Sequence, residues 1–151
     1  MKRNLLLVTL ASMLACAMAL SWVAQAAPVG GKADAKCLAE AVRTLPPGFN
    51  PSNYTFHGGT QGDDAFEDPF TAGPDVFCGF GGDDSLQAPW LDAGDIFLGG
   101  AGNDTIFDNF GTFYGGEGND RVHDNDLGAT FNGGPGDDSV INDLGGIFVQ
   151  D

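Results

Sequence analysis

Residues 99–107 read GGAGNDTIF and decide the fold of this 151-residue chain. Near copies follow as GGEGNDRVH at 115–123 and GGPGDDSVI at 133–141. The shared pattern is G-G-x-G-x-D-x-U-x, in which U is a large apolar residue. The glycines allow tight turns with positive φ, and x-U-x predicts a short strand whose U side chain points inward. Repetition at this spacing predicts turn-and-strand units that stack on one another.

The three copies resemble the calcium-binding nonapeptide of the RTX (repeats-in-toxin, haemolysin-type) family. The resemblance implies a parallel β-roll with calcium held between stacked turns. Calcium takes about 6–8 oxygen ligands, so backbone carbonyls and an Asp carboxylate suit it, and Asn103 or Asn119 can add a neutral oxygen. The candidate ligands are Asp64, Gly79, Gly81, Asp83, Asp84, Gly99, Ala101, Asn103, Asp104, Gly115, Glu117, Asn119, Asp120, Gly133, Pro135, Asp137 and Asp138.

Two kinds of turn alternate along residues 58–151. The acidic turns are GGTQGDD at 58–64, GFGGDD at 79–84, and the GGAGND, GGEGND and GGPGDD motifs that begin at 99, 115 and 133. Weaker turns lie between them, at 71–75, 91–95, 108–111, 124–128 and 142–146. Each coil therefore contains two turns, and the acidic and weaker turns are expected at opposite edges of the roll. In the first acidic turn Thr60 stands where the second glycine belongs, so this turn fits the pattern less well.

The apolar residues sort in the same way. The weaker turns are followed by Phe77, Phe97, Phe113, Phe131 and Phe148, and the acidic turns by Phe66, Leu86, Ile106, Val122 and Val140. We expect an all-β, two-sheet parallel solenoid in which one sheet contributes a phenylalanine stack and the other a mainly aliphatic column.

The acidic turns stack carboxylates in a column. Neighbouring Asp residues, from Asp64 to Asp138, would lie about 4.8 Å apart, the spacing of strands in a sheet. Two charges that close repel by roughly 1 kcal/mol in water and about 4 kcal/mol at an effective dielectric constant of 20. We therefore expect a fold that depends on calcium, with about four ions in the gaps between the five acidic turns. The acids at the weaker turns are expected to be solvated turn caps, the alternative being one or two further ions; they are Asp75, Asp95, Asp108, Asp126 and Asp143.

Residues 1–26 have the features of a cleaved signal peptide. Lys2 and Arg3 precede an apolar run, and Ala24-Gln25-Ala26 matches the small-residue cleavage pattern. Removing this segment leaves 4 basic and 21 acidic residues, a net charge of −17. Such a charge disfavours nucleic acid or an anionic membrane as a partner. No second apolar run is long enough to span a bilayer, so secretion to the periplasm or the exterior is expected.

The N-terminal region 27–57 contains one expected helix, residues 33–45, and a connector at 49–56 that is rich in Pro, Asn and Ser and is expected to be irregular. The helix carries an apolar stripe of Cys37, Leu38, Ala41, Val42 and Leu45. We expect this stripe to cover the apolar outer face of the phenylalanine sheet, near Val76, Ile96 and Leu98.

The mature chain has two cysteines, Cys37 on the helix stripe and Cys78 on that sheet face, and an oxidising compartment favours a disulfide between them. The alternatives are a helix that caps the first coil, or two free thiols.

The sequence contains no recognisable catalytic constellation. It lacks HExxH and G-x-S-x-G, and His57 and His123 are expected to be surface residues. The leading interpretation is an exported, non-enzymatic calcium-binding β-roll. The alternative is calcium-dependent adhesion or self-association through the apolar outer face of the phenylalanine sheet, with a cell-surface partner or a second copy. Ice binding is disfavoured, because the third turn position holds no row of Thr or Asn.

Overall fold

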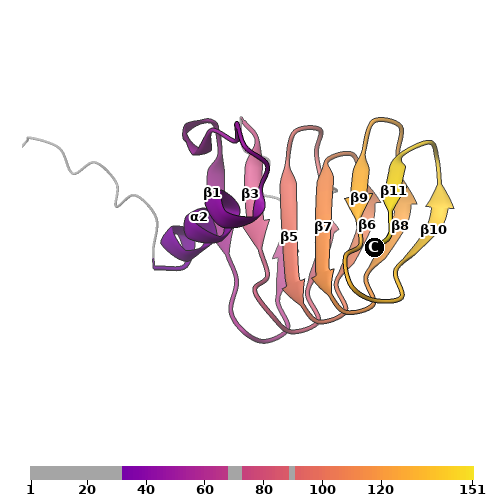
Figure 1. The fold of residues 1–151 in the computed structure, drawn as a ribbon, viewed down its shortest axis with the longest axis horizontal. Helices are drawn as coiled ribbons and strands as arrows, with labels where there is room; N and C mark the ends of the chain where they lie inside the picture. The colour runs from indigo at the N-terminus through magenta and orange to yellow at the C-terminus, as the bar shows by residue number, and fades with distance from the viewer. Residues whose placement is uncertain (1–31, 68–72, 89–90) are drawn as a thin grey trace, which may run out of the picture.

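The computed structural model describes residues 32–67, 73–88 and 91–151, and the expected signal peptide lies outside these residues. Within them the chain forms a β-solenoid made of two parallel sheets, with one helix beside it (Figure 1). The first sheet has the strand order β1 (Thr55–Gly58), β3 (Asp75–Cys78), β5 (Ile96–Ala101), β7 (Thr112–Glu117), β9 (Thr130–Asn132) and β11 (Ile147–Val149). The second sheet has the order β2 (Ala65–Glu67), β4 (Ser85–Ala88), β6 (Thr105–Asn109), β8 (Arg121–Asn125) and β10 (Ser139–Asp143).

The phenylalanine stack lies inside the first sheet, as the sequence predicted. Phe97 pairs in register with Phe113, Phe113 with Phe131, and Phe131 with Phe148. The ring centroids of these pairs are 5.2, 4.9 and 4.9 Å apart. Leu86, Ile106 and Val122 face the stack from the second sheet and are fully buried. One apolar side chain per strand thus builds a continuous core, which fixes the register of both turn edges.

The first sheet begins earlier than the sequence predicted. Residues 49–56 were expected to form an irregular connector, but β1 starts at Thr55, after a short 3-10 helix, η1 (Pro51–Asn53). His57 was expected at the surface; instead it lies in β1 opposite Phe77 and stacks on that ring with centroids 4.8 Å apart. Its Nε2 lies 2.8 Å from Oδ1 of the buried Asp75. His57 therefore continues the phenylalanine stack by one ring. The sequence did not indicate this, because no glycine-rich turn precedes β1.

Helix α2 (Lys32–Thr44) lies across β1 and β3 on the outer face of the first sheet (Figure 1). Its buried side is narrower than predicted, because only Cys37, Ala41 and Leu45 are buried, whereas Leu38 and Val42 are 37% and 58% exposed. The buried residues share one cluster with the outward-facing Val76, Cys78, Ile96 and Leu98. The prediction that the helix covers this face is confirmed.

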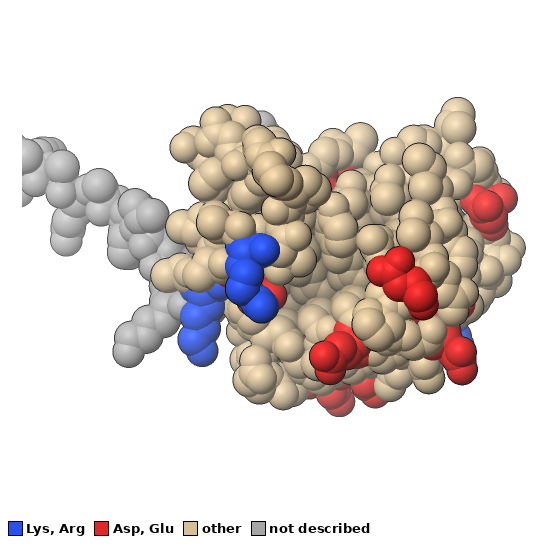
Figure 2. Space-filling view, in the orientation of Figure 1, with Lys and Arg blue, Asp and Glu red and all other residues tan. Residues whose placement is uncertain are grey.

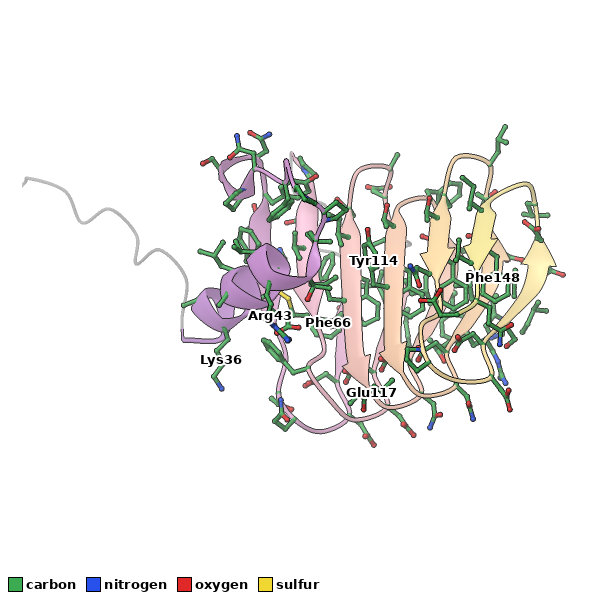
Figure 3. The ribbon with its side chains drawn as sticks, viewed as in Figure 1. Lys36, Arg43, Phe66, Tyr114, Glu117 and Phe148 are labelled. Atoms are coloured by element: carbon green, nitrogen blue, oxygen red, sulfur yellow. A yellow bond between two sulfur atoms is a disulfide. The ribbon has the colours of Figure 1, made fainter. Side chains whose placement is uncertain are left out.

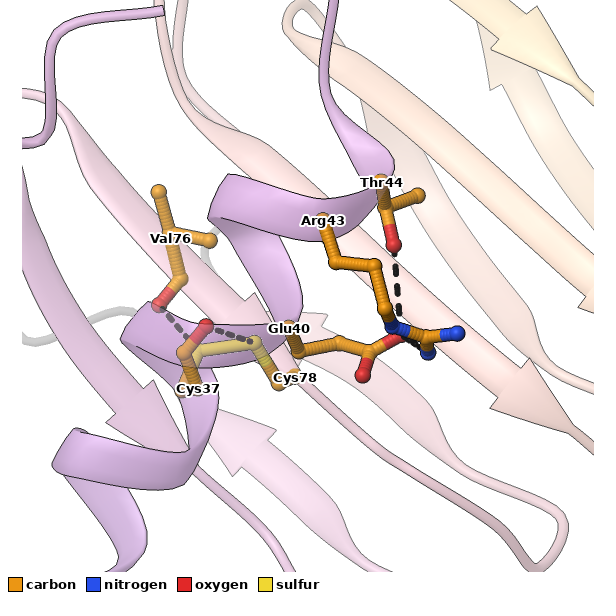
Figure 4. Close-up of a disulfide and its surroundings, with 6 residues drawn as sticks. All are labelled: Cys37, Glu40, Arg43, Thr44, Val76 and Cys78. Carbon is orange, nitrogen blue, oxygen red and sulfur yellow. Dashed lines mark hydrogen bonds and ion pairs between the residues drawn. A yellow bond between two sulfur atoms is a disulfide. The ribbon is translucent and has the colours of Figure 1, made fainter.

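A disulfide joins Cys37 of α2 to Cys78 of β3, with an S–S distance of 2.02 Å (Figure 4). The bond connects positions 41 residues apart in the sequence. It holds the helix on the sheet beside Val76, whose carbonyl oxygen lies 3.6 Å from Sγ of Cys37. The pairing agrees with the prediction and makes α2 an integral part of the first coils.

Candidate metal centre

The acidic turns share one backbone conformation from the second turn onward. Their second position has positive φ, as in Phe80 (73°), Gly100 (112°) and Gly116 (111°), and their fourth position does as well. A Cβ at the fourth glycine would strike the coil before it: at Gly136 it would lie 1.6 Å from the carbonyl oxygen of Gly118. Glycine is required there because the coils pack backbone against backbone. This close packing brings the same atoms together in every coil.

One carboxylate oxygen of each inner Asp builds a ladder along the acidic edge. Oδ1 of Asp84 accepts from the backbone N–H of Asp64 at 2.7 Å, and Oδ1 of Asp104 accepts from the N–H of Asp84 at 2.8 Å. Asp120 and Asp138 continue the ladder with 2.7 and 2.8 Å bonds. Hydrogen bonds to a carboxylate are charge-assisted and therefore strong. The ladder needs an acceptor oxygen at this position, which the Asp side chain supplies.

The other oxygen of the same four carboxylates is buried without a hydrogen-bond partner anywhere in the described ranges. These atoms are Oδ2 of Asp84, Asp104, Asp120 and Asp138. The four residues are between 0% and 9% exposed. Burying a carboxylate oxygen with nothing to satisfy it is costly, because charged groups lose their hydration. The same orphaned oxygen recurs in four successive coils, where a proton or a cation would satisfy it.

Three of the four orphaned oxygens lie close to a backbone carbonyl oxygen of the next coil, in a small cradle at the first glycine of the turn. A Cβ placed on Gly79 would lie 1.9 Å from Oδ2 of Asp84 and 2.4 Å from the carbonyl oxygen of Gly99. At Gly99 the corresponding distances are 2.1 Å to Asp104 and 2.5 Å to Gly115.

The third cradle is at Gly115. A Cβ placed on Gly115 would lie 2.0 Å from Oδ2 of Asp120 and 2.6 Å from the Gly133 carbonyl oxygen. For a Cβ placed on Gly133, the three nearest atoms all belong to Asp138. Three cradles therefore combine carboxylate and carbonyl oxygens, which are ligands that calcium prefers.

The electrostatics of the cradles follow from their burial. Burial raises the pKa of Asp104 to about 7 and the pKa values of Asp84 and Asp120 to about 6. Hydrogen bonds from the backbone ladder lower these values, and neighbouring carboxylates such as Asp120 beside Asp104 raise them. Burial therefore makes the charged form of each group less favourable than in an exposed Asp, and a cation close by would favour it.

The residue before each inner Asp forms a second ladder that runs in the opposite direction. Oδ1 of Asp83 accepts from the N–H of Asn103 at 2.8 Å, Oδ1 of Asn103 from the N–H of Asn119 at 2.9 Å, and Oδ1 of Asn119 from the N–H of Asp137 at 2.8 Å. These side chains are exposed. Asp and Asn serve equally here, because each offers a carbonyl-type oxygen. The structure thus gives the predicted ligands at this position a role in stacking the coils.

The third position of each turn carries a carbonyl that already accepts one hydrogen bond. The carbonyl oxygens of Ala101, Glu117 and Pro135 accept from the N–H groups of Gly82, Gly102 and Gly118 at 2.8, 2.8 and 3.0 Å. The Glu117 side chain points away from the roll at the edge of the turn (Figure 3). Each carbonyl keeps a second lone pair, so these residues could contribute backbone oxygens but not side chains. Gly81 is less tightly packed: a Cβ placed on it would lie 3.5 Å from the Ala101 carbonyl oxygen, an ordinary contact.

At the opposite edge, backbone N–H groups satisfy the buried Asp95, whereas burial and the neighbouring Asp124 raise the pKa of Asp108. Oδ1 of Asp95 accepts from the N–H of Asp75 at 2.8 Å, and Oδ2 accepts from the N–H of Asp92 at 3.2 Å. Asn109 and Asn125 form a buried pair, joined by a 2.9 Å bond from Nδ2 of Asn109 to Oδ1 of Asn125. Asp95 caps its turn as expected, but it is buried at 3% exposure, whereas a solvated cap was expected. The asparagine pair was missed, although its regular sixteen-residue separation was visible in the sequence.

In the part of the chain that the structure describes, no three His, Cys, Asp or Glu side chains gather into a group that could hold a metal ion. Each of the three cradles contains a single Asp carboxylate, and its other oxygen is a backbone carbonyl. The same residues contain no helix long and apolar enough to cross a membrane. Comparisons of the chain with protein-family models, with curated proteins and with solved structures found no match.

Proposed function

We propose that this chain is an exported, non-enzymatic β-roll that binds calcium along its acidic edge and folds only when calcium is bound. The observation that supports this most strongly is the orphaned Oδ2 atom of Asp84, Asp104, Asp120 and Asp138, which recurs in successive coils. A buried carboxylate oxygen with no donor is rare in stable proteins, and its repetition excludes an isolated packing defect. A bound cation would satisfy it.

Calcium suits the cradles better than other common cations. Their oxygens come from carboxylates and peptide carbonyls, and none comes from sulfur or nitrogen. Calcium tolerates irregular oxygen shells at about 2.3–2.6 Å, whereas magnesium demands octahedral geometry and retains water. Asp104 would supply charge at its cradle and Gly115 a carbonyl oxygen. Bound calcium would also remove the mutual repulsion of the Asp column.

The cradles lead us to propose about three ions per chain, fewer than the four that the gaps between turns suggested. Three cradles combine a carboxylate with the carbonyl of the following coil, at Gly79, Gly99 and Gly115. The calcium-binding haemolysin-type repeat is the arrangement that this proposal most resembles. The disulfide between Cys37 and Cys78 supports an oxidising, exported location.

Adhesion through the outer face of the first sheet is less well supported than the sequence suggested. Helix α2 packs against Val76, Ile96 and Leu98, the most apolar part of that face. What stays exposed is the end of the face at β11, where Ile147 and Val149 are 60% and 41% exposed.

Isothermal titration calorimetry of the purified chain tests the proposal. We expect saturable calcium binding with a stoichiometry of about three and little binding of magnesium at equal concentration. Asp104→Asn should reduce the stoichiometry by about one, because it removes the charge from the middle cradle. No measurable binding at millimolar calcium would refute the proposed function.

A further inference from the structure

The first acidic turn differs in conformation from the four that follow. Its second and fourth positions are Thr60 and Gly62, and neither lies in the left-handed region that Phe80, Gly82 and their equivalents occupy. The turn therefore follows a different path, although its inner residue, Asp64, stands in the same ladder. Its backbone N–H donates to Asp84 at 2.7 Å.

Thr60 supplies hydrogen-bond donors to the inner Asp of its turn, which the other acidic turns lack. Oδ2 of Asp64 accepts from the Thr60 backbone N–H at 2.6 Å and from its hydroxyl at 3.0 Å. The hydroxyl oxygen in turn accepts from the N–H of Gly62 at 3.1 Å. The equivalent oxygens of the next four inner Asp residues have no partner among the described residues. The hydroxyl proton has a second acceptor in the Gly62 carbonyl oxygen at 3.1 Å. The Thr60 backbone N–H, joined by the hydroxyl when it donates to the carboxylate, therefore satisfies Asp64 from within its own turn.

The cradle of the first turn is also filled. A Cβ built on Gly59 would lie 2.9 Å from the ring of Phe66, where the later cradles present a carbonyl oxygen of the next coil. Phe66 packs edge-on against Phe77 and Phe97, with centroids 5.8 and 5.6 Å apart. An apolar ring offers a cation no ligand oxygen. Both the donors and the packing oppose a cation at this turn.

We propose that Thr60 takes the place of a cation in the first turn, so that this turn closes without metal and acts as a template for the metal-dependent coils. This inference rests on the proposed calcium binding. The template comprises the helix α2, β1, the first turn and β3, which pairs with β1 and carries the disulfide to α2. Its N–H at Asp64 presents a donor to Asp84, the first carboxylate that requires a cation. Stacking would then proceed from the N-terminal end, one cation at a time.

Substitution of Thr60 tests the inference directly. Thr60→Gly restores the repeat consensus G-G-x-G-x-D at 59–64 and removes the hydroxyl, so calcium stoichiometry should rise from about three to about four. The matched control, Thr60→Ser, keeps the hydroxyl and should leave the stoichiometry at about three. Asp64→Asn should also leave it unchanged, because Asp64 is not a ligand in this account.

A second measurement does not depend on the variants. Hydrogen exchange of the wild-type chain in chelator should show protected amides in α2, β1 and residues 59–64, and fast exchange from Gly99 onward. Three results would overturn this inference alone. They are four ions in the wild type with one lost in Asp64→Asn, no gain of an ion in Thr60→Gly, and equal hydrogen exchange in all coils. A wild-type chain that binds no calcium would overturn the proposed function instead.

Discussion

At the scale of single residues, the inner Asp position carries two separate tasks. One oxygen holds the neighbouring coil by accepting its N–H, and the other, in Asp84, Asp104, Asp120 and Asp138, has no partner in the described structure. The first task needs only an oxygen, whereas the second needs a counter-charge. The two tasks can therefore be separated by replacing Asp with Asn, which keeps the acceptor and removes the charge.

Asp104→Asn should have opposite effects with and without calcium. Its Oδ1 can still accept from Asp84, and its Nδ2 can donate to the Gly115 carbonyl across the cradle. Because the amide nitrogen that replaces the unpartnered oxygen has a hydrogen-bond acceptor, the metal-free variant should be more stable than the metal-free wild type by about 1–3 kcal/mol. Calcium should stabilise the variant less than the wild type. Thermal melting in chelator and in calcium measures both effects. Asp137→Asn, which removes an exposed charge, is the control, and parallel shifts in the two variants would contradict this account.

The first glycine of each turn is predicted to be irreplaceable for a different reason. A methyl group at Gly99 would lie 2.1 Å from Oδ2 of Asp104 and 2.5 Å from the Gly115 carbonyl oxygen, which blocks the cradle. Gly99→Ala should destabilise the calcium-bound chain by at least about 2 kcal/mol and abolish binding at this cradle. Gly81→Ala is the matched control, since its methyl group meets nothing closer than 3.5 Å. Equal denaturation midpoints for the two variants would show that the cradle is not a binding site.

The sequence predicted the Asp position but not how the carboxylate is used. The sixteen-residue separation between two successive acidic turns places Asp104 and Asp120 one above the other, and this follows from periodicity alone. Which oxygen joins the ladder depends on backbone geometry across two coils, which no local pattern records. The Thr60 substitution was visible in the sequence as a departure from the consensus, but its hydrogen bonds to Asp64 were not.

At the scale of elements, α2 and the first sheet are coupled by packing and by a covalent bond (Figure 4). The sequence predicted both, because one apolar helix stripe and one apolar sheet face each contained a cysteine. It missed β1, since residues 55–58 lack the glycine turn that marks the other coils. Only the pairing of Thr55 with Asp75 and of His57 with Phe77 makes this segment a strand.

Removing the disulfide should loosen the N-terminal coils. For the 41-residue separation between Cys37 and Cys78, the chain-entropy model gives a loss of about 4 kcal/mol of stability. The double variant Cys37→Ser/Cys78→Ser should therefore unfold at lower denaturant concentration in saturating calcium. Reducing agent should reproduce the shift in the wild type and have no effect on the variant. An unchanged midpoint would mean that α2 packing alone holds this region.

At the scale of the whole molecule, charge is distributed unevenly. Basic side chains gather on α2, and acidic ones lie along the edge formed by the acidic turns and toward the far end of the roll (Figure 2). The chain carries 21 acidic and 6 basic residues in all. Self-repulsion of this kind opposes a compact state, so the roll should respond strongly to any change that neutralises its acidic edge.

Protonation is one such change, and its direction follows from the pKa values. Burial raises the pKa of Asp104 to about 7 and those of Asp84 and Asp120 to about 6, above the value of about 3.9 in unfolded chains. The metal-free fold therefore binds more protons than the unfolded chain, and its stability is greatest below about pH 4 and is lost as pH rises through 6 to 7. Metal-free protein should gain strand signal in far-UV circular dichroism when the pH is lowered from 8 to 5. A loss of signal on acidification would contradict the assigned burial.

The central claim is that the stacked carboxylates prevent a compact fold until calcium bridges the coils. Far-UV circular dichroism with thermal melting, on the same purified chain at pH 7.5 in excess EGTA and in millimolar calcium, tests it most directly. We predict strand content and a cooperative melt in calcium, little of either beyond the N-terminal coils in EGTA, and no rescue by magnesium. Equal spectra and equal melting temperatures in EGTA and in calcium would contradict the account.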